Sequence, residues 1–260
     1  LMRFALPARR RIAERNIAVC LPELDAGGRD RLVRDHFAAL ARMLAETAGC
    51  WAGPAQDLQA IPEVRGMEHA DEARSDGRGL LLITAHLTCL ELGARVMGER
   101  FAGCGMYRPL GNEVLEWYQN RGRAWYAEGM ISKRDIRRAV RHLRAGGVLW
   151  YAPDQDFGAA QSAFVPFFGV PTATLLASHR LPRMTGCRVM AMMPRFDRDS
   201  GGYVVELSPL LEDFPGEDPL QDLARINALL EEQVRKAPEQ YWWIHRRFKT
   251  RPEGEPPFYD

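Results

Sequence analysis

The chain has 260 residues, a formal net charge of +1, 46% hydrophobic and 27% charged residues. This length can bury a sizeable core in one α/β domain, and the composition excludes wholesale disorder. No apolar run reaches the roughly 18 to 20 residues that span a bilayer. The five cysteines are widely spaced and lack the close pairs of zinc or redox motifs, so we expect a reduced, cytosolic environment.

Two helices are predicted near the N-terminus, followed by strands that alternate with helices. The helices are expected over residues 8–20, 28–48, 88–100, 134–144, 172–181 and 220–236. The strands are expected over 79–84, 148–151, 188–196 and 203–207, the last two paired across a polar turn. This alternation predicts an α/β fold, with a mostly parallel central sheet and helices on both faces.

Functional sites in such sheets lie beyond the carboxyl ends of the strands, and His86 and Asp154 each follow a predicted strand end. A histidine can take a proton from a hydroxyl, and a carboxylate on its other nitrogen fixes the tautomer. With His86 in the strand-to-helix turn and Glu91 in the first helical turn, we expect these two side chains to meet. Thr88 and Glu91 also fit a capping box, in which Glu91 only caps the helix.

Three other chemistries compete with this hypothesis. Cys89 is a candidate nucleophile, although a small residue in the first turn of a helix more often packs. The other five histidines lack a short ligand pair such as His-x3-His, so no metal site is predicted. The aromatic run Tyr241-Trp242-Trp243 beside a basic tail is better explained by core packing or an interfacial position than by base stacking. We therefore expect no nucleic-acid partner.

His86, four residues and then Glu91 resemble the His-x4-acidic motif of glycerolipid acyltransferases. With Leu92-Gly93-Ala94-Arg95, the segment resembles the late acyltransferases of lipid A biosynthesis. Further matches follow in the same order along about residues 11–252: Tyr107-Arg108-Pro109, Gly122-Arg123, Trp150-Tyr151-Ala152-Pro153-Asp154-Gln155-Asp156, Phe164-Val165-Pro166-Phe167-Phe168, Ala237-Pro238-Glu239-Gln240-Tyr241 and His245-Arg246-Arg247-Phe248-Lys249-Thr250-Arg251-Pro252. The resemblance implies a glycerolipid-acyltransferase-like fold.

The resemblance also implies direct transfer of a fatty acyl chain from an acyl carrier protein thioester to a hydroxyl of a lipid A precursor. No metal and no cofactor are implied. His86 is the implied base with Glu91 as its partner, and Arg123 and Asp154 are implied further catalytic residues. Substrate-binding roles are expected for the cationic residues Arg108, Arg246, Arg247 and Lys249.

Membrane placement follows from the same resemblance, which implies the cytoplasmic face of the bacterial inner membrane. Family members usually begin with an apolar anchor helix that this sequence lacks, so we expect an anchor to precede it. We divide the chain into an N-terminal amphipathic helical segment, residues 1–50, and an acyltransferase domain, residues 51–260. The N-terminal cluster Arg9, Arg10, Arg11 and Arg15 is predicted to bind the anionic inner-membrane surface.

Two rival functions remain open at this stage. One is an acyltransferase for a glycerophospholipid or glycolipid acceptor, and the other is a non-catalytic lipid-binding module of the same fold. Acyl chain length and the acylated hydroxyl do not follow from the sequence.

Overall fold

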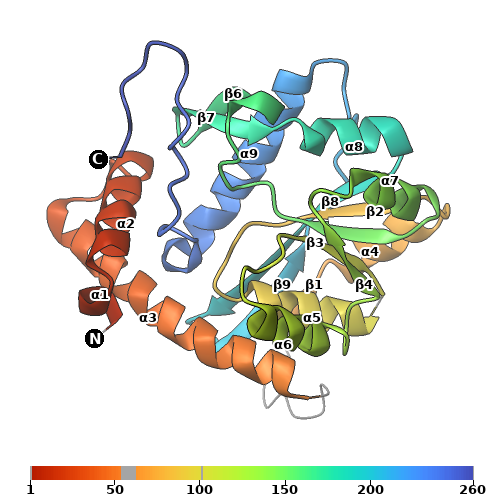
Figure 1. The fold of residues 1–260 in the computed structure, drawn as a ribbon, viewed down its shortest axis with the longest axis horizontal. Coiled ribbons are helices and arrows are strands. Elements are labelled where there is room, and N and C mark those ends of the chain that lie inside the picture. The colour runs from red at the N-terminus through yellow and green to blue at the C-terminus, as the bar shows by residue number, and fades with distance from the viewer. Residues whose placement is uncertain (1, 54–62, 101, 260) are drawn as a thin grey trace.

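The computed structural model describes residues 2–53, 63–100 and 102–259. Its main sheet has seven strands in the order β1-β9-β8-β2-β5-β3-β4 (Figure 1). Their bounds are β1 Glu63–Arg65, β2 Leu80–Ile83, β3 Cys104–Tyr107, β4 Gly129–Ser132, β5 Val148–Tyr151, β8 Arg188–Asp197 and β9 Gly202–Leu207. Every neighbouring pair is parallel except β8 and β9, so the mostly parallel sheet is confirmed.

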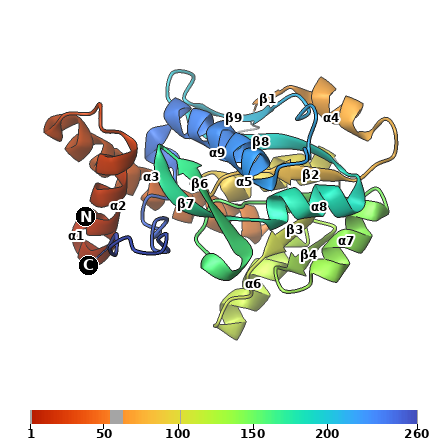
Figure 2. The same ribbon diagram turned by 90° about the horizontal axis from the view of Figure 1, so that it is seen from above.

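Helices cover both faces of this sheet, as the alternation predicted (Figure 2). Their bounds are α1 Met2–Ala5, α2 Pro7–Cys20, α3 Ala26–Ala52, α4 Met67–Arg74, α5 Leu90–Arg100, α6 Glu113–Arg123, α7 Ile136–Arg144, α8 Ala177–Thr185 and α9 Pro219–Lys236. Short 3-10 turns lie at Ala159–Gln161 and Pro238–Gln240.

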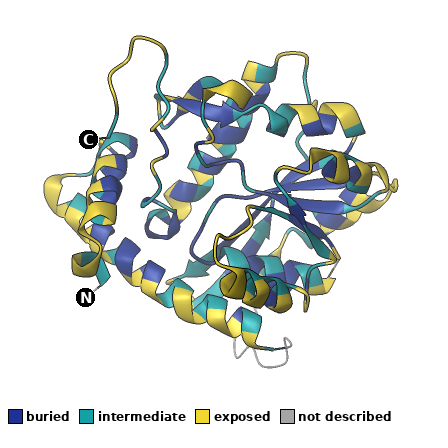
Figure 3. Ribbon diagram, viewed as in Figure 1, coloured by how far each residue is buried: buried dark blue, intermediate teal, exposed yellow. Residues whose placement is uncertain are grey.

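The central strands β2 and β5 are buried along their whole length (Figure 3). Successive side chains of a strand point to opposite faces, and here they enter two separate cores. Leu81 and Ile83 belong to the core that includes residues of α7, α8 and α9. Leu80 and Leu82 pack in the other core, with residues of α4 and α5. A continuous apolar run in β2 therefore reflects burial on both sides of the sheet.

The predicted helix over residues 172–181 is wrong in its first part. Val170–Leu175 is strand β7, which pairs antiparallel with β6, Ser162–Phe167, and the helix α8 begins only at Ala177. Phe168 and Gly169 both have positive φ, as a two-residue hairpin turn requires. The partner strand decides the conformation of 170–175, because its own short apolar pattern fits either a helix or a strand.

The N-terminal helices α2 and α3 pack into the same core as the sheet. Ile17 and Leu40 are buried there together with Trp243 near the C-terminus. Asn16 ties these segments, since its side-chain amide donates to the carbonyls of Trp243 (2.7 Å) and His245 (2.8 Å). Among the described helices, none is both long enough and apolar enough to cross a membrane.

Candidate active site

His86 and Asp154 meet because their strands are neighbours. Strands β2 and β5 run parallel and in register, with Ile83 opposite Tyr151. His86 and Asp154 each follow the last residue of their strand by three positions. The Nδ1 atom of His86 lies 2.6 Å from Oδ1 of Asp154, and the backbone N–H of His86 donates to Oδ2 at 2.9 Å. The carboxylate of Asp154 is therefore the group that orients the imidazole.

The electrostatics of this pair favour an ionised aspartate. Burial by itself raises the pKa of Asp154, but the charge and the hydrogen bonds of His86 outweigh it, so the pKa lies below its usual value. An ionised Asp154 accepts the proton of Nδ1 and leaves Nε2 of His86 as the proton acceptor. The Asp154 side chain is 1% exposed and that of His86 is 29% exposed. The histidine is thus accessible to a substrate while its partner is not.

Glu91 does not pair with His86, and the predicted dyad is wrong in this respect. Its carboxylate accepts hydrogen bonds from Trp51 Nε1 (2.7 Å), from Arg123 Nε (2.8 Å) and Nη2 (2.7 Å), and from the Tyr126 hydroxyl. The capping-box alternative is also wrong, because the N–H of Thr88 donates to the carbonyl of Gln240 instead. Helix α5 begins at Leu90, and its first turn directs Glu91 toward α3 and α6.

Arg123, the last residue of α6, forms a bidentate ion pair with Glu91. Burial raises the pKa of Glu91, but the hydrogen bonds and charge of Arg123 outweigh this effect and hold the carboxyl below its usual pKa. Both groups are therefore charged, and they lock one another in place. The pair uses Nε and Nη2 of Arg123, which leaves Nη1 for another acceptor. Glu91 thus fixes the orientation of the Arg123 guanidinium.

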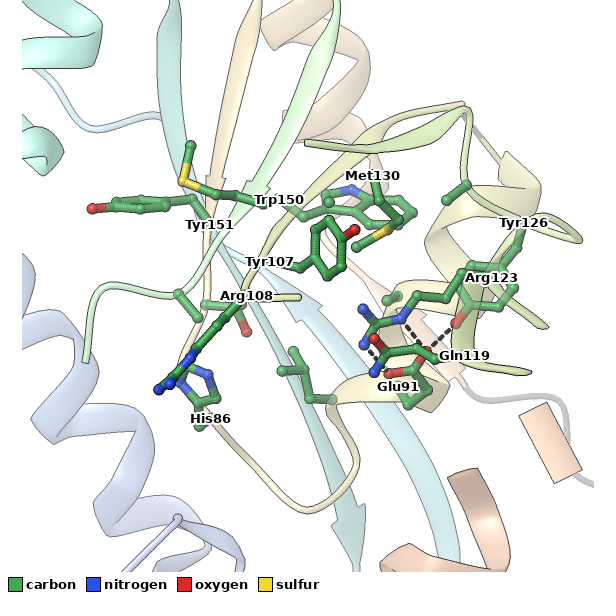
Figure 4. A pocket seen from close by; sticks show the side chains of 17 residues that line it. His86, Glu91, Tyr107, Arg108, Gln119, Arg123, Tyr126, Met130, Trp150 and Tyr151 are labelled. Atoms are coloured by element: carbon green, nitrogen blue, oxygen red, sulfur yellow. Dashed lines mark hydrogen bonds and ion pairs between the residues drawn. The ribbon is translucent and has the colours of Figure 1, made fainter. Parts of the chain in front are cut away.

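Two cavities adjoin His86. The first has a volume of about 280 Å³ and is lined by His86, Glu91 and Arg123 together with apolar side chains that include Met106, Met130 and Trp150. In Figure 4, the group of Glu91, Arg123 and Tyr126 lies on one side of this cavity and His86 on the other. We call it the apolar cavity, because hydrocarbon side chains form much of its wall.

The second cavity, of about 640 Å³, we call the cationic cavity. It is lined by His86, His245, Arg108, Lys133 and Arg134 among others. Arg108, Lys133 and Arg134 form no ion pair with another described residue. Burial and the neighbouring charges of Arg108 and Arg134 lower the pKa of Lys133. Asp156 is the one acidic residue in the lining, so positive charge exceeds negative charge at this wall, and an anionic ligand would stabilise it.

The cationic residues Arg246, Arg247 and Lys249 near the C-terminus differ in burial. Arg247 is 2% exposed and donates from Nη1 to the carbonyl of Ala173 (2.7 Å), so it holds the β6–β7 hairpin, and its prediction as a substrate-binding residue is wrong. Arg246 and Lys249 are exposed, and neither lines the apolar or the cationic cavity. Arg108 alone of the four predicted substrate-binding residues lines both cavities.

Several site residues escaped the sequence analysis. His245 lines the cationic cavity, and its Nε2 accepts the backbone N–H of Asp156 at 3.0 Å. Burial lowers the pKa of His245 to about 4, so it is neutral at physiological pH. Trp51 and Tyr126, which bind Glu91, gave no local signal because they come from distant segments. Lys133 directly follows β4, at the sheet edge where the site lies, and that position was an available signal.

Cys89 is poorly suited to act as a nucleophile. It is 1% exposed, its thiol donates to Oε1 of Gln240 at 3.1 Å, and burial raises its pKa to about 12. The thiolate that nucleophilic attack requires is therefore scarce at neutral pH.

One group of potential metal ligands is present in the described part of the chain. Ligand atoms of Cys104, Glu128 and His142 lie within 4.8 Å of one another. Burial raises the pKa of Cys104, and Nε2 of His142 is 2.9 Å from the carbonyl of Val148. The thiol therefore resists the deprotonation that metal binding needs.

A buried aspartate behind an accessible histidine, with space for hydrocarbon on one side and positive charge on the other, has the geometry expected of an enzyme that activates a hydroxyl of an amphiphilic substrate. Comparison with known proteins narrows this class. The profile of the bacterial lipid A biosynthesis acyltransferase family matches residues 1–250, and the chain belongs to this family of acyltransferases.

Its relatives in Escherichia coli K12 differ in the acyl chain that they are named for. The lipid A biosynthesis lauroyltransferase is 38% identical over 96% of this chain and 82% of its own length. The palmitoleoyltransferase is 36% identical over 98% of this chain and 83% of its own length. The myristoyltransferase is 29% identical over 95% of this chain and 77% of its own length. Among solved structures, the 1-acyl-sn-glycerophosphate acyltransferase of Thermotoga maritima matches 68% of this chain and 72% of its own, with a TM-score of 0.41 and 13% identity, which is too distant to support an argument.

Proposed function

We propose that the protein transfers a fatty acyl chain from an acyl carrier protein thioester to a hydroxyl of a lipid A precursor, in lipopolysaccharide biosynthesis. We place the reaction at the cytoplasmic face of the bacterial inner membrane. The observation that carries this proposal is the His86–Asp154 pair, which lies where the apolar and cationic cavities adjoin. Family membership and the names of the relatives support the acceptor class.

The proposed reaction is direct transfer. His86 Nε2 takes the proton of the acceptor hydroxyl while the hydroxyl oxygen attacks the carbonyl carbon of the thioester. Asp154 stabilises the imidazolium that forms, through the hydrogen bond to Nδ1. The C–S bond then breaks, and the leaving thiolate takes the proton from His86. No acyl-enzyme intermediate is required, in keeping with the buried, protonated thiol of Cys89.

Arg123 is proposed to stabilise the oxyanion that the attack creates. Its ion pair with Glu91 fixes the guanidinium in the wall of the apolar cavity before substrate binds. A preoriented donor costs no reorganisation during the reaction, which is the main source of such stabilisation. Glu91 is thus a positioning residue, and Nη1 of Arg123 is the proposed donor.

The two cavities suggest how the substrates divide. The apolar cavity suits an acyl chain, since Met106, Met130 and Trp150 present hydrocarbon and ring surfaces. Arg108, Lys133 and Arg134 suit phosphate groups of the acceptor or of the carrier protein's prosthetic group. Arg246 and Lys249 lie outside both cavities, and we propose that their exposed charges contribute only to general attraction of anionic partners.

The decisive experiment supplies purified protein with acyl carrier protein thioesters of several chain lengths and a lipid A precursor. Mass spectrometry should show an acceptor heavier by one acyl chain, and His86→Gln should abolish this product. Parallel reactions with a lysoglycerophospholipid and a glycolipid test the rival acceptors. Transfer to one of these but not to the lipid A precursor would overturn the proposal, and binding without turnover would indicate a non-catalytic module.

A further inference from the structure

Exposed large hydrophobic side chains are concentrated in one short segment. Of thirteen such residues in the described part of the chain, six fall between positions 110 and 125. Their exposed fractions are Leu110 41%, Val114 72%, Leu115 55%, Trp117 59%, Tyr118 37% and Trp125 53%. We call this group the α6 surface. Single exposed apolar residues are ordinary, but their concentration in one segment marks a candidate binding surface.

Helix α6 is firmly held through its other face, so the exposure does not come from a loose helix. Asn112 caps its start by accepting from the N–H groups of Val114 and Leu115, both at 3.0 Å. Arg123 pairs with Glu91 at its end, and Gly122 packs so closely on Trp51 that an added Cβ would lie 2.4 Å from the Trp51 Cβ. Figure 2 shows α6 projecting at the edge of the molecule.

The chemistry of the α6 surface matches the interface of a lipid bilayer. Tryptophan and tyrosine prefer the boundary between hydrocarbon and headgroups, where their rings are buried and their polar atoms stay hydrated. The Arg121 guanidinium lies 5.4 Å from the ring centre of Trp117, so a cation accompanies the ring to the level of anionic headgroups.

The α6 surface lies beside the candidate active site, because the same helix lines the apolar cavity. Gln119 and Arg123, on the same helix, line the apolar cavity that also holds His86. A bilayer at the α6 surface therefore adjoins the cavity in which acyl transfer is proposed. We propose that the α6 surface inserts into the headgroup region of an anionic bilayer, so that the lipid acceptor reaches His86 without crossing bulk water. This inference rests on the proposed function for its lipid acceptor.

The N-terminal arginines offer a competing membrane contact, as the sequence analysis predicted. They belong to α2, which lies at a different end of the molecule from α6 in both ribbon views (Figures 1 and 2). Arg9 donates to the carbonyl of Ile244 at 3.2 Å, and Arg10 pairs with Glu14 at 2.9 Å. These contacts engage two of the four arginines within the protein, and Arg11 and Arg15 are exposed, so the relative weight of the two surfaces is a matter for the test.

The test compares two double variants matched for exposed apolar side chains. Leu115→Ser/Trp117→Ser removes part of the α6 surface, and Met184→Ser/Leu220→Ser removes residues that are 45% and 48% exposed elsewhere. Co-sedimentation uses vesicles of phosphatidylethanolamine with a minor share of phosphatidylglycerol. We expect the α6 variant to bind at least about tenfold more weakly, while the matched control binds like wild type. The triple variant Arg9→Ala/Arg10→Ala/Arg11→Ala should lose less than the α6 variant.

Acyl transfer in detergent micelles separates this inference from the proposed function. We expect the α6 variant to keep wild-type transfer in micelles and to lose it with acceptor embedded in vesicles. Equal vesicle binding by the α6 variant and wild type would overturn the inference, whatever the outcome for transfer. Self-association of wild type that the α6 variant abolishes, with vesicle binding unchanged, would assign the surface to a second copy and also overturn it.

Discussion

Asp154 Oδ1 lies 2.6 Å from Nδ1 of His86, although the two residues are 68 positions apart in the chain. Parallel pairing of β2 with β5 brings their carboxyl ends to one edge of the sheet, and equal three-residue offsets then align the side chains. The acidic residue of the His-x4-acidic motif, Glu91, is held elsewhere by Arg123. The two residues of the motif, the proposed base and the proposed positioning carboxylate, are therefore not a directly bonded pair.

Asp154→Asn should lower kcat by about 10²- to 10⁴-fold, because a neutral amide neither fixes the tautomer nor stabilises the imidazolium. The substitution preserves shape at a position that is 2% exposed, so folding should persist. Steady-state acyl transfer and circular dichroism measure the two effects. Asp222→Asn is a matched control, since buried Asp222 lies 2.7 Å from His179 Nδ1 outside both cavities. Similar losses of kcat in both variants would contradict the role of Asp154.

Glu91→Gln should destabilise the fold by about 3 kcal/mol, because Arg123 is left largely buried without its counter-charge. Urea unfolding measures this loss, and transfer should also fall because Arg123 is no longer positioned. In the double variant Glu91→Gln/Arg123→Gln, part of the stability should return while activity stays low. Unchanged stability in Glu91→Gln, combined with lost activity, would instead favour a direct role for Glu91 in proton transfer.

Arg247→Met should destabilise the protein by about 3 kcal/mol, since it removes a buried cation and leaves the carbonyl of Ala173 without its donor. Arg246→Ala, one position earlier and exposed, should change stability by less than about 0.5 kcal/mol. Thermal unfolding of both variants provides the comparison. An unaltered melting temperature for Arg247→Met, with a raised KM, would restore Arg247 to the substrate-binding residues.

Acid should destabilise the fold through His36, which lies fully buried. Its Nδ1 is 2.9 Å from the carbonyl of Glu239, Nε2 has no hydrogen-bond partner, and burial lowers its pKa to about 4. In the unfolded state His36 binds a proton near pH 6.5. The contribution of neutral, buried His36 to the free energy of unfolding is therefore complete above that pH and is lost as the pH falls toward 4. We expect His36 to account for about 2 to 3 kcal/mol of the loss.

His36→Asn keeps a donor for the Glu239 carbonyl but does not titrate, so its unfolding free energy should fall less between pH 7 and pH 4.5. Urea unfolding at both pH values measures the difference. His245, with a pKa of about 4, should cause a similar acid loss that persists in the variant. An equal fall in unfolding free energy between the two pH values for wild type and His36→Asn would show that His36 does not cause the acid destabilisation.

The sequence by itself determined most of the elements and singled out His86 as the candidate base. The apolar runs of β2 and β5 predict buried strands, because each run carries its own signal of burial on both faces. The helices α7 and α9 follow from their own periodicity in the same way. His86 and Asp154 were both recognised as residues beyond strand ends, and the ordered family motifs singled them out.

Only the tertiary structure decided which side chains meet. Periodicity is a property of one segment, whereas the strand order that places β5 beside β2 depends on packing between segments distant in the chain. That order brings His86 within hydrogen-bond distance of Asp154, whereas Glu91 pairs with Arg123. The same limit explains why Arg247 was predicted to bind substrate, whereas β7 was predicted as part of a helix because its short apolar pattern fits either conformation. β7 becomes a strand by pairing with β6, which precedes it across a two-residue turn, whereas Arg247 binds the carbonyl of Ala173, 74 positions away in the chain.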